Sequence, residues 1–348
     1  MMDNRSKKYR NIDALRTLGC LAIILWHVFA NLNYEWGGII FERIIPSFNY
    51  LVYLFMLISG FGMCNGYYDK VYNGNFDVNK FYFRRYKKNV PFFALVVLLD
   101  CLMSFSLGTL YEAFIEITML FGFLPNNNLS VIGVAWTLGV IFVFYIVYPY
   151  FVFLIYSKKR AWISLVISLL ITYTCQTYFM TDKFVVPDYS MRHSFLYCIP
   201  FFVMGGLLYL YKSKIEEIIN KYALRITIGC IGLTVLYYFI PDQIKGIDVV
   251  AFKCLILYSS WLCVALGKTN VVMSNRFTAL ISGISMEMYL SHMVVFRLID
   301  KIGISVILGN SVIGYICACL VVIAVLISVI LIYKKIVRMI SVKIKQVC

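Results

Sequence analysis

The stretch RTLGCLAIILWH, residues 16–27, sets an arginine and a histidine inside the first long apolar run of the chain. His27 follows Arg16 by eleven positions, and eleven steps of roughly 100° return to nearly the same helix face, about 16 Å further along the axis. Ionisable side chains inside a bilayer are costly and are usually kept for function. We therefore expect a membrane helix with a cation near one surface and an imidazole deep in the bilayer.

The composition is that of a helical membrane protein. Of the 348 residues, 61% are hydrophobic, and the mean hydropathy is +0.82, which excludes a soluble globular chain. The net charge of +15 would suggest a nucleic-acid partner in a soluble protein. Here the Lys and Arg residues fall in short loops, as membrane topology requires, so no nucleic-acid partner is expected. The eleven cysteines lack metal-type spacing and are predicted to be small buried side chains, with neither a disulfide framework nor a metal site.

Ten apolar segments are predicted to span the membrane, because each approaches the roughly 20 residues that a spanning helix needs. They cover residues 12–31, 46–67, 90–108, 131–156, 161–180, 194–211, 224–241, 249–266, 277–298 and 311–333. A further stretch at 111–124 is short and acidic, and it is expected to be interfacial or re-entrant. The prediction is one all-α domain, residues 1–348, with its helices around a central cavity.

The loop charges orient these helices. With a cytoplasmic N-terminus, the inside segments hold 24 of the 32 Lys and Arg residues and the outside loops hold six. This bias predicts that both termini are cytoplasmic and that the number of spans is even. The basic segment RSKKYR, residues 5–10, is followed by an apolar run without a small-residue cleavage site, so no cleavable signal peptide is expected. The predicted location is the plasma or inner membrane, crossed many times.

One face of the first helix gathers its polar and small residues. The members of one roughly 60° sector are Asp13, Arg16, Gly19, Cys20, Ile23 and His27. Gly19 and Cys20 would leave a slot between Arg16 and His27. Alternatively, Arg16 reaches the inner headgroups and His27 bonds a backbone carbonyl, and these residues alone leave both interpretations open.

Two further motifs follow. Ser59-Gly60-Phe61, in FMLISGFGM at 55–63, would permit close helix approach or a break, and such small residues mostly serve packing. In KFYFRRYKKNVPFF at 80–93, a basic cluster precedes Pro91, which suits the start of a helix. The cluster consists of Arg84, Arg85, Lys87 and Lys88. It can hold the phosphates of a cytoplasmic ligand, although a basic cluster beside a membrane helix, taken alone, more often binds anionic lipid and sets topology.

A second membrane histidine appears in ISMEMYLSHMVVF, residues 284–296. Ser285, Tyr289 and His292 share one helix face, and His292 lies about 15 residues into its segment, at a depth close to that of His27. Two histidines at one depth predict a shared cavity. Asp100 and Glu287 are also placed mid-membrane, where each must be neutral, paired or facing water.

These motifs, in this order, resemble the acyltransferase 3 family of integral membrane acyltransferases over nearly the whole chain. The matching elements are Asp13-Ala14-Leu15-Arg16 with His27, Ser59-Gly60-Phe61, the Arg-x-x-Arg-x-x-Pro-like run from Arg85 to Pro91, Trp136 to Tyr145 with Pro149, and Tyr289-Leu290-Ser291-His292. Lys88 replaces a frequent second Arg and loses its bidentate fork. Ile141 replaces a frequent Glu. The end at Cys348 resembles the stand-alone form without an extracellular hydrolase-like domain.

The resemblance implies an acyltransferase that moves an acyl group, expected to be acetyl, from cytoplasmic acyl-CoA to a hydroxyl of a cell-surface polysaccharide or lipid-linked glycan precursor. His27 would be the general base, with an acyl-histidine intermediate as a variant. Asp13 would orient Arg16. The donor phosphates would lie on Arg16, Arg84, Arg85 and Lys88. The acceptor or the thioester would contact His292, Tyr289, Ser285, Trp136 and Tyr145.

Two other functions fit parts of the pattern. A transporter or flippase of a small organic molecule or lipid-linked sugar would also use ten helices and buried ionisable groups, but no inverted repeat is recognisable. A scaffold or sensor would leave the matched histidine depths as coincidences. The expected partners are acyl-CoA, a carbohydrate acceptor and the lipid bilayer, without a metal, and a homo-oligomer is left open.

Overall fold

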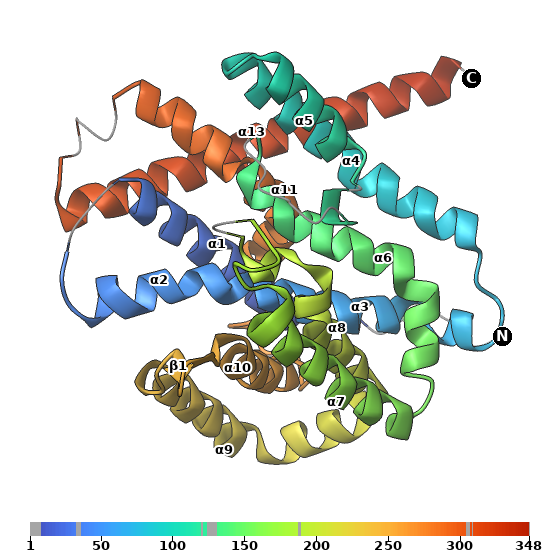
Figure 1. Ribbon diagram of the computed structural model, residues 1–348. Coiled ribbons are helices and arrows are strands. Elements are labelled where there is room, and N and C mark those ends of the chain that lie inside the picture. Colours follow the sequence, from blue (N-terminus) through green and yellow to red (C-terminus); the bar gives the residue numbers. More distant parts are fainter. Residues whose placement is uncertain are drawn as a thin grey trace.

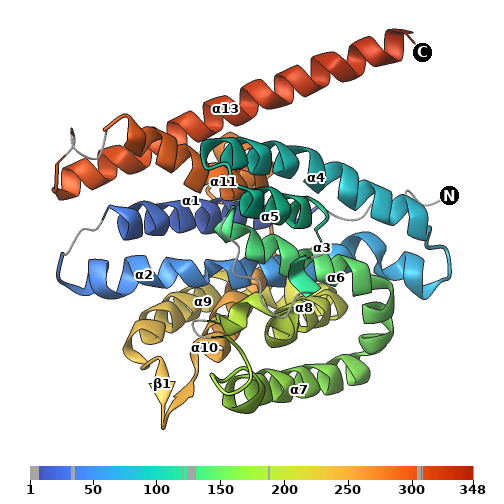
Figure 2. The ribbon, with the colours of Figure 1, turned by 45° about the horizontal axis from the view of Figure 1, so that its top comes forward.

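The computed structural model describes residues 8–32, 36–119, 121–123, 131–186, 189–303, 307 and 309–347. The chain is 81% helical with almost no strand, so the predicted all-α class is confirmed. Figures 1 and 2 show long helices packed side by side, with the β1–β2 hairpin projecting beside α9 and α10.

The main helices are α1 (Ile12–Asn31), α2 (Ile45–Ser47), α3 (Val52–Tyr72), α4 (Val78–Met103), α5 (Leu107–Ile117), α6 (Trp136–Leu154), α7 (Lys158–Thr174), α8 (Phe195–Leu210), α9 (Lys212–Phe239), α10 (Val250–Ala265), α11 (Arg276–Lys301) and α13 (Val312–Val347). Short 3₁₀ or π turns are η1 (Ile40–Ile44), η2 (Phe48–Leu51), η3 (Phe121–Phe123), η4 (Gly133–Ala135), η5 (Cys175–Phe179) and η6 (Met191–His193). The strands β1 (Gln243–Ile244) and β2 (Ile247–Asp248) pair antiparallel.

Seven helical stretches among the described residues are long and apolar enough to cross a membrane, which makes this a multi-pass membrane protein. They are Ile12–Asn31, Ile40–Tyr72, Gly133–Leu154, Lys158–Phe179, Lys212–Phe239, Arg276–Lys301 and Val312–Val342. The apolar helices α8 and α10 have 16 residues each, and the first half of α4 is basic. Each of the ten predicted segments falls on a helix, but the count of ten spans stays a prediction. So does the cytoplasmic position of the termini, although the start of α1 and the end of α13 point toward the same end of the bundle (Figure 2).

The predicted start of the third segment is wrong. Pro91 lies inside α4, which begins twelve residues before residue 90, at Val78. The side chain of Asp77 caps this helix by accepting a hydrogen bond from the Lys80 N–H at 2.8 Å. A proline removes one helical hydrogen bond, but packing such as the 2.6 Å bond from the Tyr82 hydroxyl to the Ile146 carbonyl holds the first half in place. The basic cluster therefore lies on a helix and not in a loop.

The stretch at 111–124, predicted as interfacial or re-entrant, overlaps α5, whose eleven residues are too short to cross a bilayer. A capping box of Ser106 and Thr109 starts this helix, and it packs against α4. Its acidic residues hold the chain that leads into α6. Glu112 accepts the Val131 N–H at 2.8 Å, and Glu116 accepts the Ile132 N–H at 3.1 Å.

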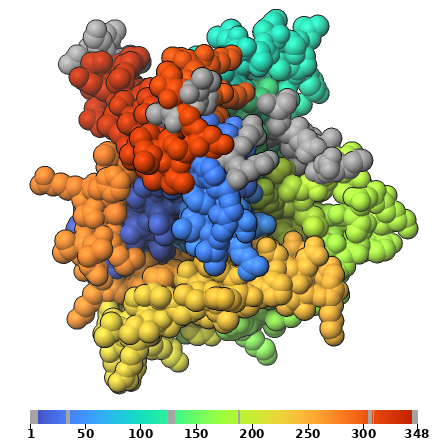
Figure 3. Space-filling view, turned by 90° about the vertical axis from the view of Figure 1, so that its left-hand side faces the viewer, coloured from blue at the N-terminus to red at the C-terminus, as the bar shows by residue number. Residues whose placement is uncertain are grey.

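The core forms where small residues bring helix backbones together. A Cβ on Gly60 would lie 2.4 Å from the Phe202 carbonyl oxygen, and one on Gly205 would lie 2.3 Å from that of Leu57. The Ser59-Gly60-Phe61 motif therefore lets α3 and α8 touch, and α3 runs through it unbroken. On one side of the molecule, the segment around residues 36–50 lies between the C-terminal helices and the α9–α10 region (Figure 3).

Candidate active site

Two histidines from different helices meet in the interior. The rings of His27 on α1 and His292 on α11 have centroids 4.8 Å apart with an interplanar angle of 64°. The two helices are held together by bonds from the Thr17 hydroxyl to the Thr278 carbonyl at 3.1 Å and from the Cys20 thiol to the Ser285 carbonyl at 3.5 Å. Their predicted match in depth thus corresponds to direct ring contact.

Backbone carbonyls set the tautomer of both rings. His27 Nδ1 is 2.9 Å from the Ile23 carbonyl oxygen, and His292 Nδ1 is 2.5 Å from that of Tyr289. Because a carbonyl can only accept, each Nδ1 holds the hydrogen, and a neutral ring then leaves its lone pair on Nε2. His292 Nε2 is buried and has no hydrogen-bond partner among the described residues. The pair can therefore accept a proton or donate a lone pair.

A cavity of about 380 Å³ lies beside this pair, enclosed by α1, α3, α4, α6, α11 and α13. Its wall is made by Arg16, Phe55, Ser59, Lys88, Thr137, Leu138, Ile141, Tyr145, Ser282, Gly283, Ser285, Met286, Glu287, Tyr289, Leu290 and Lys334. Three of these side chains are cations and one is a carboxylate. The cavity therefore favours a negatively charged ligand.

Tyr289 lies both in the cavity wall and next to His292. Its hydroxyl donates to the Val134 carbonyl at 2.9 Å or to the Thr137 hydroxyl at 2.8 Å, and its ring lies 5.8 Å from that of His292. Tyr289 and Thr137 line the cavity, whereas His27 and His292 are not part of its wall. A ligand in the cavity would have to pass or displace Tyr289 to reach the imidazoles.

The slot expected along α1 is closed, so that expectation is wrong. The Cys20 thiol lies against the Ser285 carbonyl, and the Phe55 ring lies 3.3 Å from where a Cβ on Gly19 would be. The small residues let neighbouring helices approach and leave no channel. The open volume lies instead among six helices, with Arg16 in its wall.

The predicted donor residues separate into different environments. Arg16 and Lys88 line the cavity, and Arg16 makes no hydrogen bond or ion pair within the described part of the chain. Asp13 interacts with Arg16 electrostatically but accepts its hydrogen bond from the Ser282 hydroxyl, at 2.8 Å. Arg84 is exposed.

Arg85 lies behind the cavity wall. Its guanidinium lies 5.1–5.4 Å from the ring centroids of Tyr67, Phe81 and Tyr145, and it donates to the Tyr67 hydroxyl at 3.1 Å. Such cation–π contacts fix an arginine in place. Since Tyr145 lines the cavity, Arg85 is placed to hold that wall and to add positive charge behind it.

The two carboxylates that were predicted to lie mid-membrane, Asp100 and Glu287, have partners that the sequence did not identify. Asp100 is 1% exposed and pairs with Arg297 at 2.5 Å. Glu287 pairs with Lys334 at 2.7 Å. From the sequence, Lys334 was counted only among the positive charges of the inside segments that orient the helices. The signal that could have found it was the need of Glu287 for a cation.

Arg192 and His193 were also missed. The Trp136 ring stacks on His193 with centroids 4.5 Å apart, and the Arg192 guanidinium is 5.3 Å from the Trp136 centroid. Burial and the Arg192 charge lower the pKa of His193 to about 3, so this ring is neutral. Arg192 also interacts electrostatically with His27. The signal was an Arg-His pair in a predicted outer loop of a chain with three histidines.

A larger cavity, of about 650 Å³, lies against a different part of α1, between that helix, α9 and α10. None of the residues described in its wall is a carboxylate, lysine or arginine. It therefore lacks the groups that ionic recognition or acid–base chemistry needs. In the described part of the chain there is also no cluster of three or more potential metal ligands.

These features define a multi-pass helical membrane protein with two facing imidazoles beside a cation-lined cavity. The family model for acyltransferase 3, an acyltransferase domain, matches residues 9–333. The chain therefore belongs to the acyltransferase 3 family and is a membrane acyltransferase. Comparisons with curated proteins and with solved structures give no significant match.

Proposed function

We propose that this protein transfers an acyl group, expected to be acetyl, from cytoplasmic acyl-CoA to a hydroxyl of a cell-surface polysaccharide or lipid-linked glycan precursor. The observation that supports this most is the contact of His27 with His292, at 4.8 Å between centroids, next to a cavity with three cations. A thioester donor needs phosphate recognition, and an acceptor hydroxyl needs a base. The two regions are suited to these two tasks.

In the proposed reaction, His27 Nε2 accepts the proton of the acceptor hydroxyl while its oxygen attacks the thioester carbonyl. The C–S bond then breaks, and the leaving thiolate takes the proton from His27. A base with a proton-bearing Nδ1 fixed to the Ile23 carbonyl presents the correct nitrogen without a change of tautomer. His292 would position the acceptor or the thioester carbonyl. If His27 attacked the thioester itself, an acyl-histidine would form, which is the variant mechanism.

The donor would approach from the cavity side. Arg16, which makes no hydrogen bond or ion pair among the described residues, and Lys88 would bind its phosphates. Since Lys88 cannot make the bidentate contact of an arginine, the geometry at that position is less constrained. Ile141 lines the same wall, so a carboxylate at that position plays no part in this chain.

The test is thioester consumption in membranes that contain the protein. Acetyl-CoA should be converted to free coenzyme A only when an acceptor glycan is added, and mass spectrometry of the glycan should show the added acetyl group. Flux of a solute or lipid-linked sugar without thioester cleavage would instead identify a transporter or flippase. Absence of acceptor-dependent cleavage, across acyl donors and glycans from the source cell, would overturn the proposal.

A further inference from the structure

Lys334, near the middle of α13, reaches into the cavity wall. Its ammonium pairs with Glu287 at 2.7 Å and donates to the Gly283 carbonyl at 2.9 Å. Both partners lie on α11, one turn apart. The side chain keeps 35% of its area exposed, so it is anchored without being enclosed.

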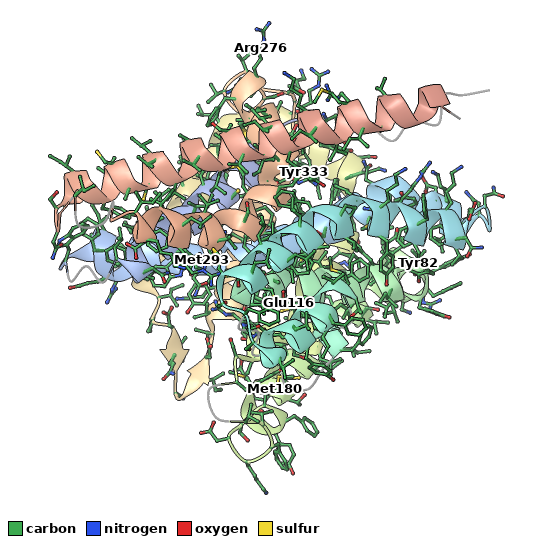
Figure 4. All side chains as sticks on the ribbon, turned by 90° about the horizontal axis from the view of Figure 1, so that it is seen from above. Tyr82, Glu116, Met180, Arg276, Met293 and Tyr333 are labelled. Carbon is green, nitrogen blue, oxygen red and sulfur yellow. The ribbon has the colours of Figure 1, made fainter. Side chains whose placement is uncertain are left out.

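Packing on the neighbouring residue fixes this position. The Tyr333 ring meets the Phe92 ring of α4 edge to face, with centroids 5.1 Å apart. Figure 4 shows Tyr333 on the side of α13 that faces α4. The α13 backbone is therefore held against α4 and α11 at the height of the cavity, which aims Lys334 at the space between them.

The charges around Lys334 do not balance. Lys88 interacts electrostatically with Arg16, Arg85 and Lys334, and the carboxylates that offset these four cations are Glu287 and, beside Arg16, Asp13. Gathering cations in a partly buried space is unfavourable unless an anion compensates them. Two carboxylates compensate two of the four cations, so the region can accept two further negative charges.

The hydrogen bonds of Lys334 leave one donor available. An ammonium group has three N–H donors, and the contacts to Glu287 and Gly283 use two of them. The two anchors would remain in place while the third N–H contacts a ligand. This differs from a surface lysine, which must lose side-chain freedom when it binds.

We propose that Lys334 is a phosphate-binding residue of the donor site, held by Glu287 and Gly283, and that α13 thereby forms one wall of that site. This rests on the proposed function for the identity of the donor. The ligand chemistry is a phosphate group of a nucleotide-type acyl donor. Glu287 is a positioning residue, because it acts through Lys334.

The first experiment compares two donors in Lys334→Ala. Charge-assisted hydrogen bonds contribute about 1.5–3 kcal/mol, so KM for acetyl-CoA should rise roughly tenfold or more, with little change in kcat. The KM for acetyl-pantetheine, which has no phosphate, should stay within about twofold. Lys335→Ala removes the exposed neighbouring charge and should change neither value. Glu287→Gln should raise KM for acetyl-CoA by less than Lys334→Ala.

The second experiment needs no turnover. Binding of free coenzyme A to the purified full chain should weaken roughly tenfold in Lys334→Ala and in Lys334→Gln, but not in Lys335→Ala, with thermal unfolding confirming that each variant is folded. Equal coenzyme A affinity in wild type and both Lys334 variants would overturn the role of Lys334. A wild-type chain that binds no coenzyme A would contradict the proposed donor itself, which is a different failure.

Discussion

The regions on the two sides of Tyr289 differ in openness, charge and burial. On one side lies an open cavity of about 380 Å³ with three cations and one carboxylate in its wall. On the other side two imidazoles pack against each other, and His292 is 1% exposed. In the proposed function, recognition of a charged donor and handling of a proton would therefore take place in separate regions, each with the polarity that its task needs.

The largest effect should come from the histidine side. His27→Gln removes the base but keeps a polar side chain of similar size, and general bases typically contribute 10²–10⁴-fold to rate. Acceptor-dependent acyl transfer should fall by roughly that factor, measured as release of free thiol. Coenzyme A binding should be unchanged, because His27 is not part of the cavity wall. Transfer at the wild-type rate would exclude His27 as the base.

An intermediate effect should follow from weakening the contacts of Tyr289, the side chain between the cavity and His292. Tyr289→Phe removes the hydroxyl that bonds Val134 and Thr137, which opens a route for water between the two sides. We expect acceptor-independent hydrolysis of acetyl-CoA to increase several-fold and the free energy of unfolding to fall by about 1–3 kcal/mol.

Tyr315→Phe is the matched control. The Tyr315 hydroxyl also bonds a backbone carbonyl, that of Leu25 at 3.0 Å, but away from the cavity. This variant should lose comparable stability and show no increase in hydrolysis. If both variants hydrolyse acetyl-CoA equally, Tyr289 does not keep water in the cavity away from the histidines.

The smallest effect on acyl transfer should come from α5, the helix that holds the chain before Val134, where the change should appear in the pH dependence of stability. Burial raises the pKa of Glu116 on α5 from 4.5 to about 8. The folded chain thus binds this proton more tightly than the unfolded chain, and stability should fall as pH rises from about 4.5 to about 8. In Glu116→Gln, which cannot ionise, the part of the slope due to this residue should disappear from thermal unfolding curves. An unchanged slope would contradict the shift.

Helical spacing was sufficient to relate His27 and His292. Both are far inside apolar segments that run in the same predicted direction, so counting residues from the segment start gave comparable depths. The backbone bonds that fix their tautomers follow from helix geometry as well, since His27 bonds the carbonyl four residues earlier and His292 the one three residues earlier. Their chemical roles remain predictions.

The cavity was harder to predict because it depends on how helices rotate and approach one another. Considered alone, the small side chains of Gly19 and Cys20 suggest an open slot on α1. Small residues also allow a neighbouring helix to pack closely, and here α11 fills that space. The partnership of Lys334 with Glu287 joins residues 47 positions apart and depends on the tilt of α13. Pro91 was a misleading helix start because the Asp77 cap, further upstream, outweighs it.

The contact of Gly60 with Phe202 and of Gly205 with Leu57 has a mechanical consequence. Two helices whose backbones are in direct contact cannot slide or tilt without atomic overlap, so α3 and α8 are expected to move as one rigid body. Movement that lets a donor past Tyr289 is therefore expected in the rest of the cavity wall, and we expect it where α13 meets α11 through the Lys334 side chain. Cross-linking those two helices should stop turnover, whereas cross-linking α3 to α8 should leave it intact.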